Sequence, residues 1–431
     1  MIGTVGLALG DQHSVIWKQG GSVWSTAITL HGFVSSLTKH LVLVIPSGAI
    51  DAAAGSSFSI VLKQDGSVWA IGQNYCGQLG DGTKVRKGTF VCADMVPGAK
   101  AVAAGGKHSL MLTHEGGILA TGSNKYGQLG DARNAAYTTK FRPAISNGSP
   151  AMSSGAIAVS AGDLHSIVLK QDGSVWTAGR NSNGQLGDGS NDDRRTFVLV
   201  MSSGAMGVAA GGSHSMVLKQ DGSVWATGRN KYGQLGDGTK IDRNRYTKTV
   251  PRGAQAVAAG KQHSIILKQD GSVWTTGYND SGQLGDGWMT DRCDFVAVIS
   301  DGATVIGAGA FHSMVAKQDG SIWATGSNRN GQYGDGTIKS AKVFVKISPF
   351  RNGDGHGTII KTQSLSPTLE FFKRTILHFL HFVLLPVCSP LNSLTFAHSI
   401  VNFATTVEPS GAAVTSRNTS RAGANGTEIF N

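Results

Sequence analysis

Apolar residues along the first 349 positions occur in short runs separated by glycine-rich turns. In a clear copy, the small-residue run AQAVAAG is followed by HSIILK, by Asp-Gly and by SVWTTG. A half-exposed strand alternates apolar and polar residues, so consecutive apolar residues such as Ile167, Val168 and Leu169 predict strands buried on both faces. Asp-Gly between two such runs predicts a hairpin with a two-residue type I′ turn. The pattern therefore predicts antiparallel sheets packed between other sheets.

This pattern is an internal repeat. Its clearest copies begin at equal intervals at His165, His214, His263 and His312, and each reads HSxxxKQDGSxWxxG followed by GQLGDG or GQYGDG. Earlier copies begin at Phe58 and His108, and a degenerate first copy begins at His13. A variable loop and a fourth short apolar strand, such as 197–200, follow each glycine-rich segment. The predicted units span approximately 1–48, 49–98, 99–155, 156–204, 205–253, 254–302 and 303–349.

Seven four-stranded units with strands apolar on both faces predict an all-β, seven-bladed propeller closed on itself. An open stack is the alternative, but it needs polar caps at both ends. The first unit carries no cap and lacks the GQLGDG segment. We expect either a distorted blade over 25–40 or a misread stretch of the gene there. The span 133–156 is longer than its counterparts.

The repeat resembles that of the regulator of chromosome condensation family, whose members form seven-bladed propellers. The resemblance covers residues 1–349 and concerns the fold and the repeat, so it says little about what is bound. It also permits guanine-nucleotide exchange on a small Ran-type GTPase, with chromatin association. Exchangers of the family insert a wedge from one blade beside the nucleotide and carry a basic N-terminal extension, and neither is evident in this sequence.

Composition agrees with short strands and tight turns, because 60 of 431 residues are glycine and only 10 are proline. The four cysteines lack C-x-x-C spacing, so we expect no zinc site. The N-terminus has no signal-peptide pattern, and we therefore expect an intracellular protein, cytoplasmic or nuclear.

Past residue 349 the repeat stops. The apolar stretch 375–388 is short for a membrane span and favours a helix that lies on the propeller or at a membrane surface, and disorder is expected from residue 408 onward.

No arrangement in the sequence predicts catalysis, and we expect neither an enzyme nor a cofactor. Adjacent residues on a strand point to opposite faces, so a pair such as His108 and Ser109 cannot act as base and nucleophile, and we expect the histidines to hydrogen-bond within or between blades. GQLGDG lacks the Lys and Ser or Thr of a phosphate-binding loop. The acidic stretch 188–193 lacks the glycine and distal glutamate of a calcium loop. Six repeated tryptophans are predicted to pack between blades; they are Trp24, Trp69, Trp176, Trp225, Trp274 and Trp323.

The variable segments after GQLGDG concentrate basic residues, and the chain has a formal net charge of +11. Equivalent loops of a propeller lie on one side, so these residues are predicted to form a basic arc for an acidic or protein partner. The predicted basic residues are Lys84, Arg86, Lys87, Arg133, Lys140, Arg194, Arg195, Lys240, Arg243, Arg245, Arg292 and Lys339. The aromatic candidates, from the same segments and from those before GQLG, are Tyr126, Tyr137, Tyr232, Tyr246, Tyr278 and Trp288.

The sequence thus predicts a monomeric, non-enzymatic interaction scaffold. Nucleotide exchange on a small GTPase is the alternative, and nucleic acid or chromatin is a further candidate partner for the basic residues.

Overall fold

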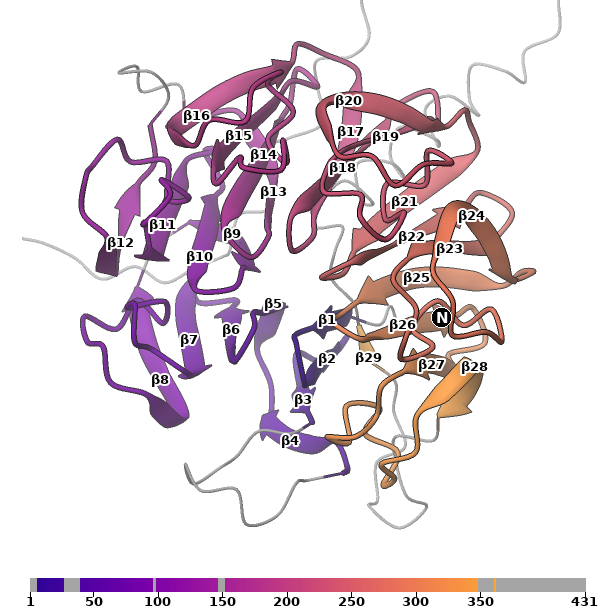
Figure 1. Cartoon of the computed structure of the whole chain (residues 1–431). Helices are drawn as coiled ribbons and strands as arrows, with labels where there is room; N and C mark the ends of the chain where they lie inside the picture. Colours follow the sequence, from indigo (N-terminus) through magenta and orange to yellow (C-terminus); the bar gives the residue numbers. More distant parts are fainter. Residues whose placement is uncertain (1–5, 27–38, 96–97, 146–151, 348–359, 362–431) are drawn as a thin grey trace, which may run out of the picture. The chain divides into compact units, whose positions relative to one another are not determined.

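Seven antiparallel sheets surround a common axis, and each sheet contains four strands that are consecutive in the chain (Figure 1). The computed structural model describes residues 6–26, 39–95, 98–145, 152–347 and 360–361, and all of its described strands belong to one compact unit. No helix occurs among these residues. The predicted all-β, seven-bladed propeller is thereby confirmed.

Each blade places its strands in sequence order from the axis outward. The innermost strands are β1 (Gly6–Leu9), β5 (Ala49–Ala54), β9 (Ala99–Ala104), β13 (Ala156–Ala161), β17 (Ala205–Ala210), β21 (Ala254–Ala259) and β25 (Ala303–Ala308). The second strands are β2 (Ser14–Lys18), β6 (Phe58–Lys63), β10 (His108–Thr113), β14 (His165–Lys170), β18 (His214–Lys219), β22 (His263–Lys268) and β26 (His312–Lys317). We number the blades 1 to 7 in this order.

The outer half of each blade contains the Trp-bearing strand and the strand that follows the variable loop. The third strands are β3 (Val23–Ser25), β7 (Ser67–Gly72), β11 (Ile118–Ser123), β15 (Val175–Gly179), β19 (Val224–Gly228), β23 (Val273–Gly277) and β27 (Ile322–Gly326). The outermost strands are β4 (Val42–Ile45), β8 (Lys87–Met95), β12 (Tyr137–Pro143), β16 (Arg194–Met201), β20 (Arg243–Val250), β24 (Arg292–Ile299) and β28 (Ala341–Ile347).

The hairpin between the second and third strands differs from the prediction. The amide of Gly66 donates to the carbonyl of Lys63, so Gln64 and Asp65 are the central residues of the turn. Gly66 follows with a φ of +80°, whereas Asp65 does not have a positive φ. A type I′ turn needs positive φ at both central residues, so the predicted two-residue turn is wrong. The connection is a three-residue loop closed by a left-handed glycine, and Asp65 instead accepts hydrogen bonds from Ser67.

The hydrophobic core lies between blades. Second strands such as β22 and β18 contain runs of buried residues, because apolar side chains on both faces meet the adjacent sheets. One cluster joins Met216 and Leu218 of blade 5 to Val257 and Ile266 of blade 6, and Trp274 packs against it. This contact agrees with the predicted packing of tryptophan between blades.

Noncovalent contacts between blades 7 and 1 close the ring (Figure 1). Leu7 and Ile16 share a buried cluster with Met314 and Ile322. The short strand β29 (Ile360–Lys361) also pairs with β2 of blade 1. Despite its divergent sequence, blade 1 has four strands, although residues 27–38 of its predicted distortion lie outside the described residues.

The predictions for the tail after residue 361, and for 146–151 of the long span between units three and four, fall outside the described residues. Within the part of the chain that the structure describes, no helix is long and apolar enough to cross a membrane.

Candidate interaction face

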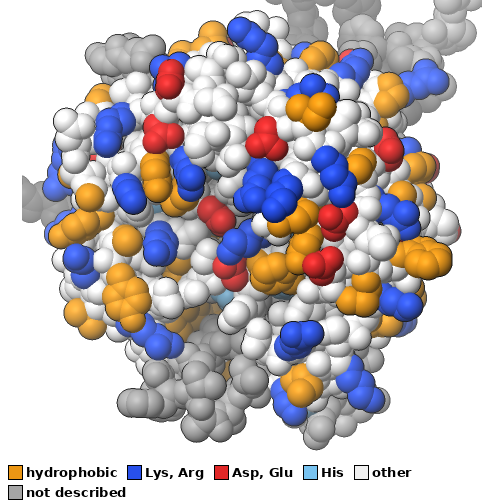
Figure 2. All heavy atoms as spheres, viewed as in Figure 1, with side chains coloured by type: hydrophobic (Ala, Val, Ile, Leu, Met, Phe, Trp, Pro, Cys, Tyr) orange, Lys and Arg blue, Asp and Glu red, His pale blue; other side chains and the backbone are white. Residues whose placement is uncertain are grey.

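One end of the propeller carries both the loops after the innermost strands and the loops after the third strands, because neighbouring strands of a blade are antiparallel. Figure 2 shows this face, on which Lys and Arg side chains alternate with acidic and hydrophobic ones. The predicted basic residues lie in the loops that follow the third strands and in the outermost strands, and the aromatic candidates Tyr126, Tyr232 and Tyr278 come shortly after the third strands. We call this end of the propeller the loop face.

The third-to-fourth-strand loops of the loop face have a fixed internal framework. In blade 5, Asn230 Oδ1 accepts from the amide of Leu235 at 3.0 Å, and its Nδ2 donates to Asp237 Oδ1 at 2.9 Å and to the carbonyl of Thr239 at 3.1 Å. Asn230 is fully buried. The equivalent asparagines Asn74, Asn124, Asn181, Asn279 and Asn328 hold their loops in the same way. The variable side chains are therefore displayed on ordered turns.

The glycines of the repeated GQLGDG segment serve the contact between blades. A Cβ on Gly187 would lie 2.5 Å from the ring of Tyr246 in the next blade. Tyr246 also packs against the buried cluster of blades 4 and 5, and burial raises its pKa. The structure therefore removes Tyr246 from the exposed aromatic candidates. The sequence signal for this burial is the phenylalanine at the equivalent position of other blades, such as Phe295 against Gly236.

Five of the twelve predicted basic residues form ion pairs with the aspartate of their own GQLGDG segment, which reads GQLGDA in blade 3. Arg243 Nε lies 2.8 Å from Asp237 Oδ2, and that aspartate side chain is only 4% exposed. Burial alone would raise the pKa of Asp237, but hydrogen bonds from Thr239 and Arg243 outweigh it and hold the pKa below its usual value. The other close pairs are Lys87–Asp81, Arg194–Asp188 and Arg292–Asp286, and Arg133 pairs with Asp131 at 4.0 Å. The cations of the four close pairs hold the loops together and are largely neutralised.

The seven other basic candidates and the distantly paired Arg133 are exposed. They are Lys84, Arg86, Arg133, Lys140, Arg195, Lys240, Arg245 and Lys339. Several make contacts across blade boundaries: Lys84 Nζ lies 4.2 Å from the ring centre of Tyr137, and Lys240 Nζ lies 3.7 Å from Asp291 Oδ2. The structure thus places cations along the predicted arc, interrupted by an acidic side chain in blade 6.

Aromatic candidates meet closer to the axis. The rings of Tyr232 and Tyr278 have centres 4.7 Å apart, and Tyr278 contacts Phe311 of blade 7. Tyr126 of blade 3 lies 5.2 Å from both Lys125 and Arg180. Desolvation is the largest of several causes that raise the pKa of Tyr278 to about 12, ahead of its hydrogen bond to Asp280. Cation–π and aromatic contacts of this kind give the face large, rigid contact groups.

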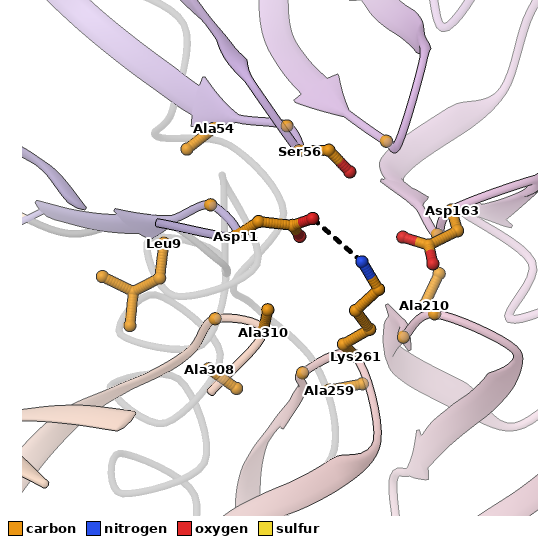
Figure 3. A pocket seen from close by; sticks show the side chains of 18 of the residues that line it. Leu9, Asp11, Ala54, Ser56, Asp163, Ala210, Ala259, Lys261, Ala308 and Ala310 are labelled. Carbon is orange, nitrogen blue, oxygen red and sulfur yellow. Dashed lines mark hydrogen bonds and ion pairs between the residues drawn. The ribbon is translucent and has the colours of Figure 1, made fainter. Parts of the chain in front are cut away.

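The mouth of the central channel adds a charged cluster that the sequence interpretation missed. Lys261 Nζ lies 2.9 Å from Asp11 Oδ2, and Asp163 projects into the same cavity of about 90 Å³ (Figure 3). Burial raises the pKa of Asp163, although Lys261 opposes the shift. These residues come from blades 6, 1 and 4. In the sequence, this cluster is indicated by the variable position that follows the repeated glycine at the end of each innermost strand.

The repeated His-Ser pairs form a buried inter-blade network. His214 Nε2 lies 2.9 Å from Ser264 Oγ in the next blade. Ser264 donates its hydroxyl hydrogen to the carbonyl of Gln234 at 2.6 Å, so the imidazole must donate from Nε2. Four equivalent serines that face a histidine are also buried and donate their proton to a carbonyl, which agrees with the predicted structural role of the histidines; they are Ser14, Ser166, Ser215 and Ser313. Among the described residues, no three His, Cys, Asp or Glu side chains are grouped to hold a metal.

The fold and this face define the class of protein: a β-propeller that presents variable, ordered loops around a narrow central channel. The chain belongs to the RCC1-like domain family, whose model matches residues 2–298, and a regulator of chromosome condensation (RCC1) repeat matches residues 304–332.

Several solved structures share this fold. Human WBSCR16 is 20% identical with a TM-score of 0.65, covering 76% of this chain and 93% of that one. Prp20p from Saccharomyces cerevisiae is 23% identical with a TM-score of 0.60, covering 70% and 80%. Yeast RCC1 (Prp20) bound to Kap60 is 17% identical with a TM-score of 0.63, covering 87% and 92%. No curated protein sequence matches the chain significantly.

Proposed function

We propose that this protein is an interaction scaffold that binds an acidic protein partner through its loop face. The proposal is supported by a difference between the repeated and the variable polar side chains of this face. Repeated residues such as Asn230, Asp237 and Arg243 bond one another, whereas variable cations such as Arg195 and Arg245 are exposed. Exposed cations beside aromatic rings suit recognition of acidic protein surfaces.

The test is a triple charge reversal, Lys84→Glu, Arg195→Glu and Arg245→Glu. Lys84, Arg195 and Arg245 are exposed and belong to blades 2, 4 and 5. We expect the variant to lose at least about tenfold of the wild-type affinity for an acidic partner, because six units of charge change on one face. Partners captured by the full chain and identified by mass spectrometry are re-measured as purified proteins.

A matched control reverses three exposed cations near the opposite ends of the outermost strands: Lys248→Glu, Arg252→Glu and Lys346→Glu. It carries the same net charge change and should retain binding. Arg194 and Arg243 are left intact because their loss would leave a buried aspartate unpaired. Equal binding by the loop-face variant and the wild type would refute the proposal.

Nucleotide exchange is the second candidate function, because the structural relative Prp20p is described with binding to Gsp1p and histones. The scaffold proposal expects no change in the rate at which a Ran-type GTPase releases a fluorescent GDP analogue when the full chain is added. Stimulation of about tenfold or more would establish exchange instead. The triple charge variant then shows whether any stimulation depends on the loop face.

A further inference from the structure

Apolar side chains project from the loop face at neighbouring positions of blades 5, 6 and 7. Ile241 is 61% exposed, Trp288 63%, Met289 55%, and Ile338 and Val343 47% each. Val343 of blade 7 flanks the turn of blade 6, since a Cβ on Gly287 would lie 3.8 Å from its Cγ1. We call these five residues the apolar arc. Large exposed apolar groups on adjacent loops are typical of a protein-binding surface.

Ordered turns hold the apolar arc in place. The amide of Trp288 donates to Asp286 Oδ1 at 3.1 Å, and its carbonyl accepts from Asn279 Nδ2 at 3.1 Å. The amide of Ile241 donates to Thr239 Oγ1 at 3.3 Å. Binding to such turns requires little loop ordering, which lowers the entropic cost of association.

Trp288 departs from the repeat in a way that the blade does not explain. In four other blades the equivalent position holds Thr or Ser whose hydroxyl donates to the aspartate of the turn, as Thr239 does to Asp237 at 2.7 Å; the others are Thr83, Ser190 and Thr337, and blade 3 has Arg133 there. In blade 6, Trp288 has no hydroxyl to donate to the aspartate, and its indole is exposed. Tryptophan is strongly enriched among residues that dominate binding energy.

The charges beside the apolar arc indicate the partner. Lys339 directly follows Ile338 and Lys342 adjoins Val343, whereas Lys240 beside Ile241 is paired with Asp291 at 3.7 Å and the exposed Asp242 follows Ile241. No carboxylate among the described residues lies within ion-pair distance of Lys339 or Lys342. We propose that the apolar arc binds an acidic segment of a partner protein through that segment's large apolar side chains. This inference rests on the proposed scaffold function and names the hydrophobic anchor of its interface.

The experiment uses phage-displayed random 16-residue peptides selected on the full chain. Selected peptides are expected to combine acidic with large apolar residues, and Trp288→Thr should weaken their binding by at least tenfold. Because this substitution restores the usual residue of the turn, the melting temperature should stay equal or rise. The matched control, Leu199→Thr, removes an apolar side chain that is 47% exposed on β16 and should leave binding unchanged.

Absence of enriched peptides, enrichment of basic or purely polar peptides, or equal binding to Trp288→Thr would each overturn the apolar arc. The two proposals fail separately. If the triple charge variant loses captured partners while Trp288→Thr keeps both partners and peptides, the scaffold stands and the arc is refuted. If Trp288→Thr loses peptides while the triple charge variant keeps every partner, the arc stands and the basic surface is refuted.

Discussion

Acidification from pH 7 to pH 5 is expected to unfold the propeller. Burial lowers the pKa of the inter-blade histidines from 6.5 to about 4 for His13, His108 and His214. It lowers the pKa to about 3 for His165, His263 and His312, where neighbouring histidines add to the shift. Each imidazole is therefore neutral in the folded state across this range.

The direction of the effect follows from which state takes up protons. Below pH 6.5 the unfolded chain protonates these six histidines while the folded chain does not, so stability is complete above pH 6.5 and falls as the pH drops toward 4. Each histidine lowers the free energy of unfolding by about 2 kcal/mol between pH 7 and pH 5, and six together by about 12 kcal/mol. That loss is as large as the whole stability of a typical domain.

Denaturant unfolding followed by circular dichroism at pH 7, 6 and 5 measures this loss. The blade 2 residue Phe58 supplies a control, because it occupies the histidine position and is 2% exposed. His214→Phe should lower the free energy of unfolding by about 1 kcal/mol at pH 7. It should also reduce the loss of stability between pH 7 and pH 5 by about 2 kcal/mol, the contribution of one histidine. His214→Ala should cost about 2–4 kcal/mol, because it also leaves a cavity. Stability independent of pH between 5 and 7 would contradict the expected role of these histidines.

The fold was predictable because the same pattern of strands and turns recurs in seven units of the sequence. Runs such as Ile167, Val168 and Leu169 can be buried on both faces only between two other sheets, and a periodic set of such sheets closes most simply as a ring. The turn type was not predictable from Asp-Gly alone. Gln64 and Asp65 are the central residues of the turn, and Gly66 follows it. The register in which the flanking strands pair determines these positions.

The loop face was less predictable, because its chemistry depends on contacts between residues distant in sequence. The exposure of Arg245 and the neutralisation of Arg243 differ because only the latter reaches the buried carboxylate of Asp237. Lys261 and Asp11 meet only after the ring has closed. A single sequence shows which positions vary, but the closed ring determines which of them face solvent.

Gly184→Ala is expected to destabilise the propeller by about 3–5 kcal/mol, because blades 4 and 5 touch at this glycine. Gly184 has a φ of +76°, and a Cβ there would overlap the Cα of Asn244 and lie 2.7 Å from the carbonyl oxygen of Arg243. Both neighbours are backbone atoms at the start of β20. They can move away only if the outermost strand of blade 5 shifts, and with it the turn that carries Arg243 and Arg245.

Gly204→Ala separates this effect from simple backbone strain. Gly204 has a φ of +82°, but a Cβ there would meet no atom within 4 Å, so its substitution should cost only about 1 kcal/mol. Chemical denaturation of both variants at pH 7 gives the comparison. Equal losses would mean that left-handed geometry alone explains the repeated glycines. A larger loss for Gly184→Ala would mean that the glycine-rich segment holds adjacent blades together, and thereby sets the spacing of the side chains on the loop face.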